Sequence, residues 1–370
     1  MLLFCRTSHL LGISYAVATL ATLMRKMKNL SKKMLAVSGL VASAPNSTKT
    51  NPKCYSKPVS CGLCTFLLAI GLLTMPATAR CGLIFVGNRN NDAPGAGTIG
   101  EYTTSGATVN PALVSGLSEP VSLAVSGGNL FVLNSFTGTV GKYTTSGAVV
   151  NPALVSVNLP NSIAVSAGNL FVSGGTFGSG TIGVYNATTG APVNPTLVSG
   201  LNDAFGIAVS GGNLFVADTV NGTIGEYNAT TGAPVNPALV SGLNFPESIE
   251  VSGGNLFVTE IGGTIGKYNA TTGAPVDPAL ISGLPVLGEI AVFGGNLFVT
   301  QINTGTIGEY NPTTGAPVNP ALVSGLNLPN GLAVVTVAET SSTGTLLLLG
   351  LAAMLGLKLM LRQPARPDRL

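Results

Sequence analysis

Residues 212–228 read GNLFVADTVNGTIGEYN, and versions of this stretch occur six times along the 370-residue chain. Each copy ends in the pattern Gly-Thr-(Ile/Val)-Gly-x-Tyr. The six tyrosines are 41 or 42 residues apart, at Tyr102, Tyr143, Tyr185, Tyr227, Tyr268 and Tyr310. A period of about 40–45 residues that is rich in β-branched residues and glycine indicates the blades of a β-propeller.

One repeat unit, residues 205–243, can be divided into four predicted strands. They are GIAVS (206–210), LFVAD (214–218), GTIGEYN (222–228) and PVNPALVS (234–241). The Gly211-Gly212-Asn213 sequence between the first two is a hairpin signal, because glycine adopts positive φ without steric cost. Proline cannot donate to a strand ladder, so the last segment is predicted to be the outer edge strand. The first two strands have no polar face, as expected for a sheet stacked between two neighbours.

The two ends of the repeat region complement each other. The first unit begins at Leu83 without its inner strand, and residues 329–335 form a lone inner strand with no successor. If these segments pair, every blade has four strands. The sequence therefore predicts an all-β fold, a six-bladed β-propeller of four-stranded blades over residues 80–338, closed by its N- and C-terminal strands.

The stretch from Gly212 to Asn228 resembles the NHL repeat of six-bladed propellers, with the shared Gly-Asn start and an aliphatic third strand. The resemblance covers residues 82–336. Thr223 stands where that family usually places arginine before the third-strand aliphatic residue. The resemblance implies the propeller fold rather than a particular activity.

The N-terminal 79 residues are predicted to be an extension and a signal peptide. Residues 61–74 are an apolar run preceded by Lys53 and Lys57, and the small residues Ala77 and Ala79 mark cleavage after Ala79. A second apolar run, residues 10–24, has two interpretations: a start codon placed too far upstream, or an additional membrane segment.

Residues 339–370 are predicted to be a sorting or anchor tail. An apolar helix is expected over 345–361, followed by Arg362, Arg366 and Arg369. With Val337–Thr343 in front, this layout resembles the PEP-CTERM class of bacterial sorting signals in its Val-Pro-Asp-Ser-Gly variant, although the Pro, Asp and Gly are replaced. The resemblance implies a sorting peptidase as partner and display at the cell surface, in the membrane or in the matrix; a plain membrane anchor is the alternative.

The charge of the chain is unevenly distributed. The whole sequence carries +3, but residues 82–338 contain three basic residues, Arg89, Lys142 and Lys267, against twelve acidic ones, a net charge of −9. An acidic domain repels phosphate backbones, which argues against nucleic acid as a partner.

The loops of the repeats differ in how much they vary. The hairpin after the inner strand and the turn after the third strand are nearly constant, whereas the other two sets of loops differ in every unit and share the opposite face. Varied loops on a rigid scaffold are where recognition is usually built. Seven carboxylates fall there and define the predicted binding face: Asp92, Glu119, Asp203, Asp218, Glu247, Glu260 and Glu289. This face is expected to bind a divalent cation, a polysaccharide or a surface protein; the alternative is a solvated rim that keeps the protein soluble.

Catalysis is not expected. The only histidine, His9, and all five cysteines precede the repeats, which excludes a Ser-His-Asp or Cys-His arrangement within them. One enzymatic alternative remains open, a calcium-dependent lactonase-like hydrolase with its site at the mouth of the central channel. Its oxygen ligands would come from Asp203, Glu247, Glu289, Asn161 and Asn330.

Overall fold

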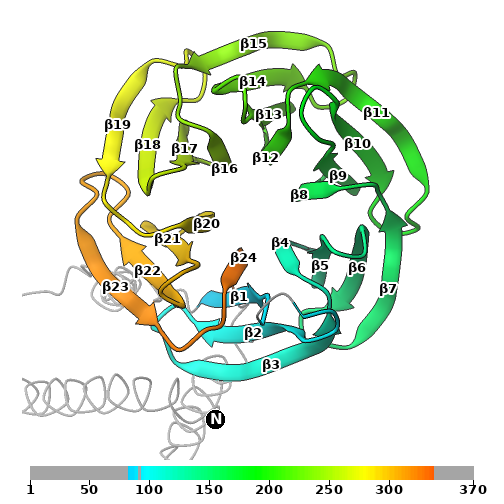
Figure 1. Cartoon of the computed structure of the whole chain (residues 1–370), viewed down its shortest axis with the longest axis vertical. Helices are drawn as coiled ribbons and strands as arrows, with labels where there is room; N and C mark the ends of the chain where they lie inside the picture. The colour runs from blue at the N-terminus through cyan, green and yellow to red at the C-terminus, as the bar shows by residue number, and fades with distance from the viewer. Residues whose placement is uncertain (1–81, 91–92, 337–370) are drawn as a thin grey trace, which may run out of the picture. The chain divides into compact units, whose positions relative to one another are not determined.

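The computed structural model describes residues 82–90 and 93–336 (Figure 1). These belong to the second of two compact units into which the chain divides, Met1–Ala79 and Arg80–Leu370. Every regular element in the described ranges is a β-strand, and none of those residues forms a helix that could span a membrane. The predicted signal segment, the tail over 339–370 with its helix at 345–361, and Asp92 lie outside the described residues.

Six antiparallel four-stranded sheets form the blades of a propeller, as the repeats predict. From the channel outward, blade 1 contains β24 (Pro329–Thr336), β1 (Gly82–Asn88), β2 (Gly97–Thr103) and β3 (Thr108–Leu117). Blade 2 contains β4 (Pro120–Ser126), β5 (Asn129–Asn134), β6 (Thr139–Thr144) and β7 (Val149–Ser156). Blade 3 contains β8 (Pro160–Ser166), β9 (Asn169–Gly174), β10 (Gly180–Asn186) and β11 (Pro192–Leu201). Blade 4 contains β12 (Ala204–Ser210), β13 (Asn213–Asp218), β14 (Thr223–Asn228) and β15 (Pro234–Ser241). Blade 5 contains β16 (Pro246–Ser252), β17 (Asn255–Glu260), β18 (Thr264–Asn269) and β19 (Pro275–Ile281). Blade 6 contains β20 (Leu287–Phe293), β21 (Asn296–Gln301), β22 (Thr306–Tyr310) and β23 (Pro317–Val323).

The ring closes through blade 1, where strands from the two ends of the domain pair. β24 lies beside β1 with Leu83 opposite Val335 and Val86 opposite Leu332. Figure 1 shows the orange β24 beside the blue β1. The prediction that residues 83–86 meet residues 331–335 is therefore confirmed, and blade 1 cannot form until both ends of the domain are present.

Apolar side chains fill the spaces between blades rather than one central core. One such cluster joins Phe171 and Ile182 of blade 3 to Ile207 and Leu214 of blade 4, all of them buried. The Gly-x-Tyr motif belongs to this packing. A Cβ on Gly225 would lie 2.7 Å from the ring of Tyr227, so glycine is required where the tyrosine folds back over its own strand.

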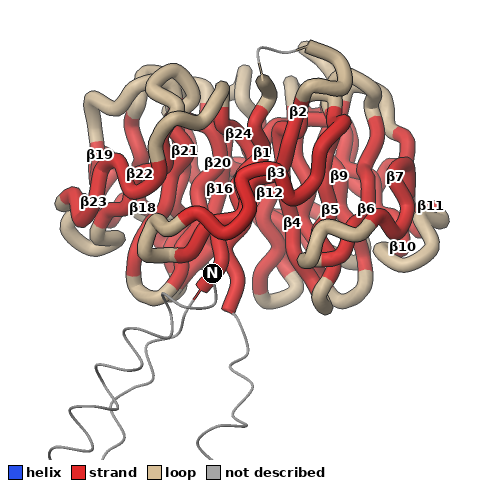
Figure 2. Tube along the Cα trace, turned by 90° about the horizontal axis from the view of Figure 1, so that it is seen from below, coloured by secondary structure: helices blue, strands red, loops and turns tan. Residues whose placement is uncertain are grey.

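Two faces of the disc differ, as Figure 2 shows from the side. The constant face carries the repeated hairpins and turns; in its Gly211-Gly212 hairpin both residues have positive φ, 60° and 85°. The variable face carries two sets of loops. Between second and third strands the described loop residues are 89–90 with 93–96, 135–138, 175–179, 219–222, 261–263 and 302–305. Between blades they are 118–119, 157–159, 202–203, 242–245, 282–286 and 324–328. Gly82 and Thr336, paired at the ends of β1 and β24, lie on the constant face.

Candidate functional site

A cavity of about 390 Å³ lies at the variable-face mouth of the central channel. The second residue of every inner strand lines it, and five residue types occur at this position around the ring. They are Val121, Asn161, Phe205, Glu247, Gly288 and Asn330. Two residues further along the same strands every blade has leucine or isoleucine. The six repeats therefore differ at the position that lines the cavity, although they are alike two residues further along the strand.

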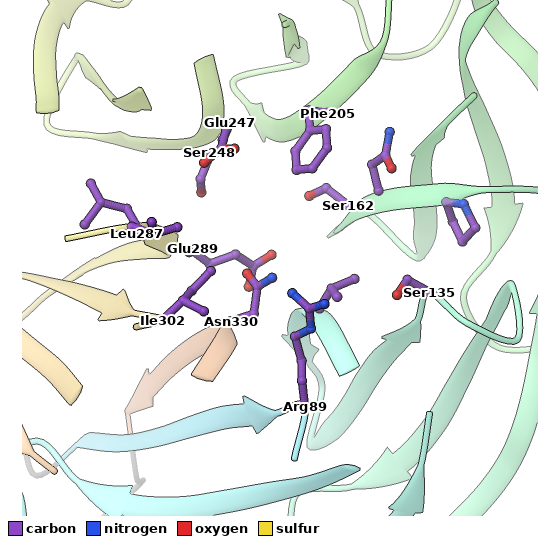
Figure 3. A pocket seen from close by; sticks show the side chains of 15 residues that line it. Arg89, Ser135, Ser162, Phe205, Glu247, Ser248, Leu287, Glu289, Ile302 and Asn330 are labelled. Carbon is purple, nitrogen blue, oxygen red and sulfur yellow. The ribbon is translucent and has the colours of Figure 1, made fainter. Parts of the chain in front are cut away.

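Loops of the variable face complete the walls. Arg89, which follows β1, points into the cavity, and Ser135, Val286, Leu287 and Ile302 add small and apolar surface (Figure 3). Arg89 was not among the residues that the sequence predicted. It could have been noticed as the only basic residue in the varied loops.

Glu289 occupies the third position of its inner strand, where the other five blades have serine or glycine. In two of those blades the serine accepts a bond from the next blade: Ile163 N–H donates to Ser122 Oγ at 3.1 Å, and Ile290 N–H donates to Ser248 Oγ at 3.4 Å. These bonds tie neighbouring inner strands together around the channel.

Glu289 extends this pattern over two blade junctions. Its Oε2 accepts from the N–H of Leu332 at 2.6 Å and from the N–H of Leu123 at 3.3 Å. At the junction between β24 and β4, the residue in the serine position is Gly331 of β24, which has no hydroxyl that could accept from Leu123. The carboxyl of Glu289 thus takes over the role of the missing serine and links β20, β24 and β4.

Burial raises the pKa of Glu289 to about 8, against the lowering effect of its bonds to Ser122, Leu332 and Leu123. Glu250 lies further along the channel, on β16, and burial raises its pKa to about 7. A second cavity, of about 310 Å³, includes Glu250 and shares Ser162, Ser248 and Glu289 with the first. The two cavities therefore adjoin along the channel, and Glu289 lines both of them.

Glu247 and Asn330 are the polar side chains that the cavity leaves available. Within the described residues neither side chain has a hydrogen-bond partner, and burial raises the pKa of Glu247. Asn161, in contrast, is engaged, because its Nδ2 donates to Ala204 O at 2.9 Å and to Asp203 Oδ1 at 3.4 Å.

The seven predicted carboxylates do not form one acidic surface. Glu247 and Glu289 reach the cavity, and Asp203 lies behind it against Asn161, where burial raises its pKa. Glu119 is half-buried and accepts a bond from Ser135 Oγ at 2.8 Å. Asp92 lies outside the described residues.

Asp218 and Glu260 require a correction, because they are buried strand residues rather than members of an exposed face. Asp218 ends β13 and accepts from Asn202 N–H at 3.0 Å; Glu260 ends β17 and accepts from Asn244 N–H at 2.7 Å. Each of the two residues is the last of its strand, and its carboxylate turns inward and fixes the adjacent loop.

Exposed apolar side chains are the feature of the variable face that the sequence analysis missed. They form two groups on neighbouring loops, blades 2–3 and blades 5–6. The first comprises Phe136 (61% exposed), Leu159 (51%) and Phe177 (74%); the second comprises Phe245 (45%), Ile261 (48%) and Val286 (50%). The other large apolar side chains that are exposed in the described residues belong to the outer strands.

Four of the five ligands expected for calcium, Asn161, Glu247, Glu289 and Asn330, line the cavity. The described residues hold no group of three or more His, Cys, Asp or Glu side chains arranged for a metal ion. Of the expected ligands, Glu289 is turned to backbone N–H donors and Asp203 does not line the cavity. We therefore derive no reaction step through calcium.

Comparisons with known proteins identify the fold. No protein-family model matches the chain, and no curated protein matches it. A crystal structure of a nidogen/laminin complex contains a chain that aligns with a TM-score of 0.56 and 13% identity, covering 68% of this chain and 98% of that one. The computationally designed Ika8 protein aligns with a TM-score of 0.44 and 16% identity, covering 69% of this chain and 78% of its own. At these identities the first likeness supports the six-bladed propeller and nothing more specific.

Proposed function

We propose that this chain is an exported, non-catalytic binding module that holds a partner protein on its variable face at the cell surface. The observation that carries this proposal is the exposure of three aromatic side chains and three aliphatic ones on that face. Exposed large apolar side chains of this kind are typical of interaction surfaces, in which aromatic residues are enriched.

The positions of the two ends of the propeller domain support display of that face. Gly82 and Thr336 are paired on the constant face, opposite the exposed apolar loops. Attachment through the tail after Thr336 would therefore leave the variable face accessible. Export by the predicted signal peptide, handling by a sorting peptidase and kinship with the NHL repeat are parts of this proposal that rest on the sequence.

The nidogen/laminin complex offers a parallel for this use of the fold. The chain that aligns with this one belongs to a nidogen/laminin complex. A propeller presents many loops on one rigid disc, so a partner can be bound without movement of the scaffold.

Cross-linking on intact cells tests the proposal. The wild-type chain is compared with a triple variant Phe136→Ser, Phe177→Ser and Phe245→Ser, and mass spectrometry identifies the cross-linked proteins. The matched control replaces three equally exposed outer-strand valines, Val193, Val235 and Val276, by serine. We expect the phenylalanine variant alone to lose its cross-links. Equal retention in both variants, or equal loss, would contradict a docking role for the variable face.

A further inference from the structure

We infer that the channel-mouth cavity is a second binding site, and that it takes about one or two residues of an uncharged sugar. This site shares only Val286 with the apolar loops of the proposed function. Its chemistry differs as well, because the cavity combines an aromatic ring, a carboxylate, an amide and a guanidinium within a small enclosed space.

The two opposite charges that line the cavity disfavour ligands that carry a net charge. Glu247 and Arg89 both line the cavity, so an anionic ligand meets a carboxylate and a cationic ligand meets a guanidinium. Glu289 does not change this balance, since its carboxyl is directed to the N–H groups of Leu123 and Leu332. A ligand without net charge avoids both repulsions and still gains bonds from each group.

The hydrogen-bonding groups match hydroxyls. Glu247 accepts, and the Asn330 amide both donates and accepts. Within the described residues the side chains of Glu247 and Asn330 are half-buried and have no hydrogen-bond partner, so a ligand that bonds to them replaces no protein contact. Each sugar hydroxyl can donate and accept, so a single sugar ring can satisfy both side chains.

The apolar wall matches the carbon face of a sugar. Figure 3 shows the Phe205 ring beside Glu247 at the rim, and Val121, Leu287 and Ile302 line the same cavity. A flat, half-buried ring accepts the C–H face of a pyranose while neighbouring polar groups hold its hydroxyls. Ligand cavities range from roughly 300 to 1,000 Å³, so 390 Å³ fits a ligand of about one or two rings.

Titration of the secreted chain with a panel of oligosaccharides tests this assignment. The panel contains neutral, carboxylated, sulfated and amino sugars, and binding is followed by calorimetry and by saturation-transfer NMR. We expect at least one neutral member to bind and the charged members to bind at least about tenfold more weakly. Phe205→Ala and Glu247→Gln are each expected to weaken that binding about tenfold or more.

Two controls keep the result interpretable. Phe177→Ser alters the variable face outside the cavity and should bind sugar as the wild type does. Glu247→Gln keeps the shape of its side chain and should melt at the wild-type temperature or above, because it removes a buried carboxylate whose pKa is raised. Binding only of charged sugars, binding of none of the panel, or neutral-sugar binding that survives both cavity substitutions would overturn the inference. Each of these results leaves the cross-linking test of the apolar loops unaffected.

Discussion

Both faces of the disc place glycine at left-handed positions, but the variable face also repeats left-handed residues other than glycine. On the constant face, left-handed positions are filled mostly by glycine, as at Gly211 and Gly273. On the variable face, the residue before the inner strand is left-handed in five blades, and in all five it is not glycine. These residues are Glu119, Leu159, Asp203, Phe245 and Leu328, with φ between 47° and 70°. Such residues cost conformational energy, and strained positions gather at functional sites. The constant face is thus adapted to folding, whereas the variable face retains side chains that folding alone would not favour.

The largest expected difference in stability between the two faces is that between Gly273→Ala and a matched substitution on the variable face. Gly273 has a φ of 70°, and a Cβ there would lie 1.8 Å from the carbonyl oxygen of Leu239 in the neighbouring blade. We expect a loss of about 3–5 kcal/mol in the free energy of unfolding, measured by urea denaturation. Gly283, on the variable face, has a φ of 74° and open space around it, so Gly283→Ala should cost only about 1–2 kcal/mol. Similar losses would mean that the constant turns do not serve as blade contacts.

The next largest effect on stability is expected at Glu289, which stands in the inner strand of blade 6 where the other blades have serine or glycine. Glu289→Ala removes the acceptor for two buried N–H groups, and we expect a loss of about 2–4 kcal/mol. Ser248→Ala removes one acceptor at the regular junction and should cost about half as much. Glu289→Ser, which restores the residue type of the repeat, should lie between wild type and Glu289→Ala. If the two alanine variants were equally stable, Glu289 would not link three strands.

A smaller effect appears in the pH dependence of stability. Burial raises the pKa of Glu289 to about 8 and that of Glu250 to about 7, so the folded domain holds more protons than the unfolded chain between pH 4.5 and 8. The free energy of unfolding should therefore be highest below about pH 4.5 and fall as the pH rises to 8. We expect a fall of about 1–2 kcal/mol over this range. Thermal melts of Glu289→Gln should show a shallower slope over this range; an unchanged slope would assign the dependence to other groups.

The smallest stability effect is expected for Phe245→Gly. Glycine relieves the left-handed strain at this position but makes the unfolded chain more flexible, so the two contributions nearly cancel, to within about 1 kcal/mol. Loss of partner cross-links without loss of stability would sharpen the contrast between the faces. A clear destabilisation would instead assign Phe245 to folding.

The sequence predicted the fold because its signals repeat. Six tyrosines at nearly equal spacing and complementary ends specify blade number and closure, and both follow from pattern alone. The site was predicted only in part. Loop comparison led to Glu247 and Glu289, but it also included Asp218 and Glu260. These two residues end strands, and their carboxylates accept bonds from adjacent loops, which variation among the loops does not reveal. The six cavity positions could have been recognised by aligning the inner strands, in which the second residue varies and the fourth does not. The exposure of Phe136, Phe177 and Phe245 could not be predicted, because it depends on loop geometry that the repeat does not encode.

The pairing of Gly82 with Thr336 has a mechanical consequence. A load that enters at the variable face and leaves at Thr336 runs along β24 and shears its ladder with β1, so several backbone bonds resist together. A load between Gly82 and Thr336 instead opens that ladder from one end, one bond after another. The domain should therefore withstand tension best when it is tethered at its C-terminal side only and its N-terminal end is free.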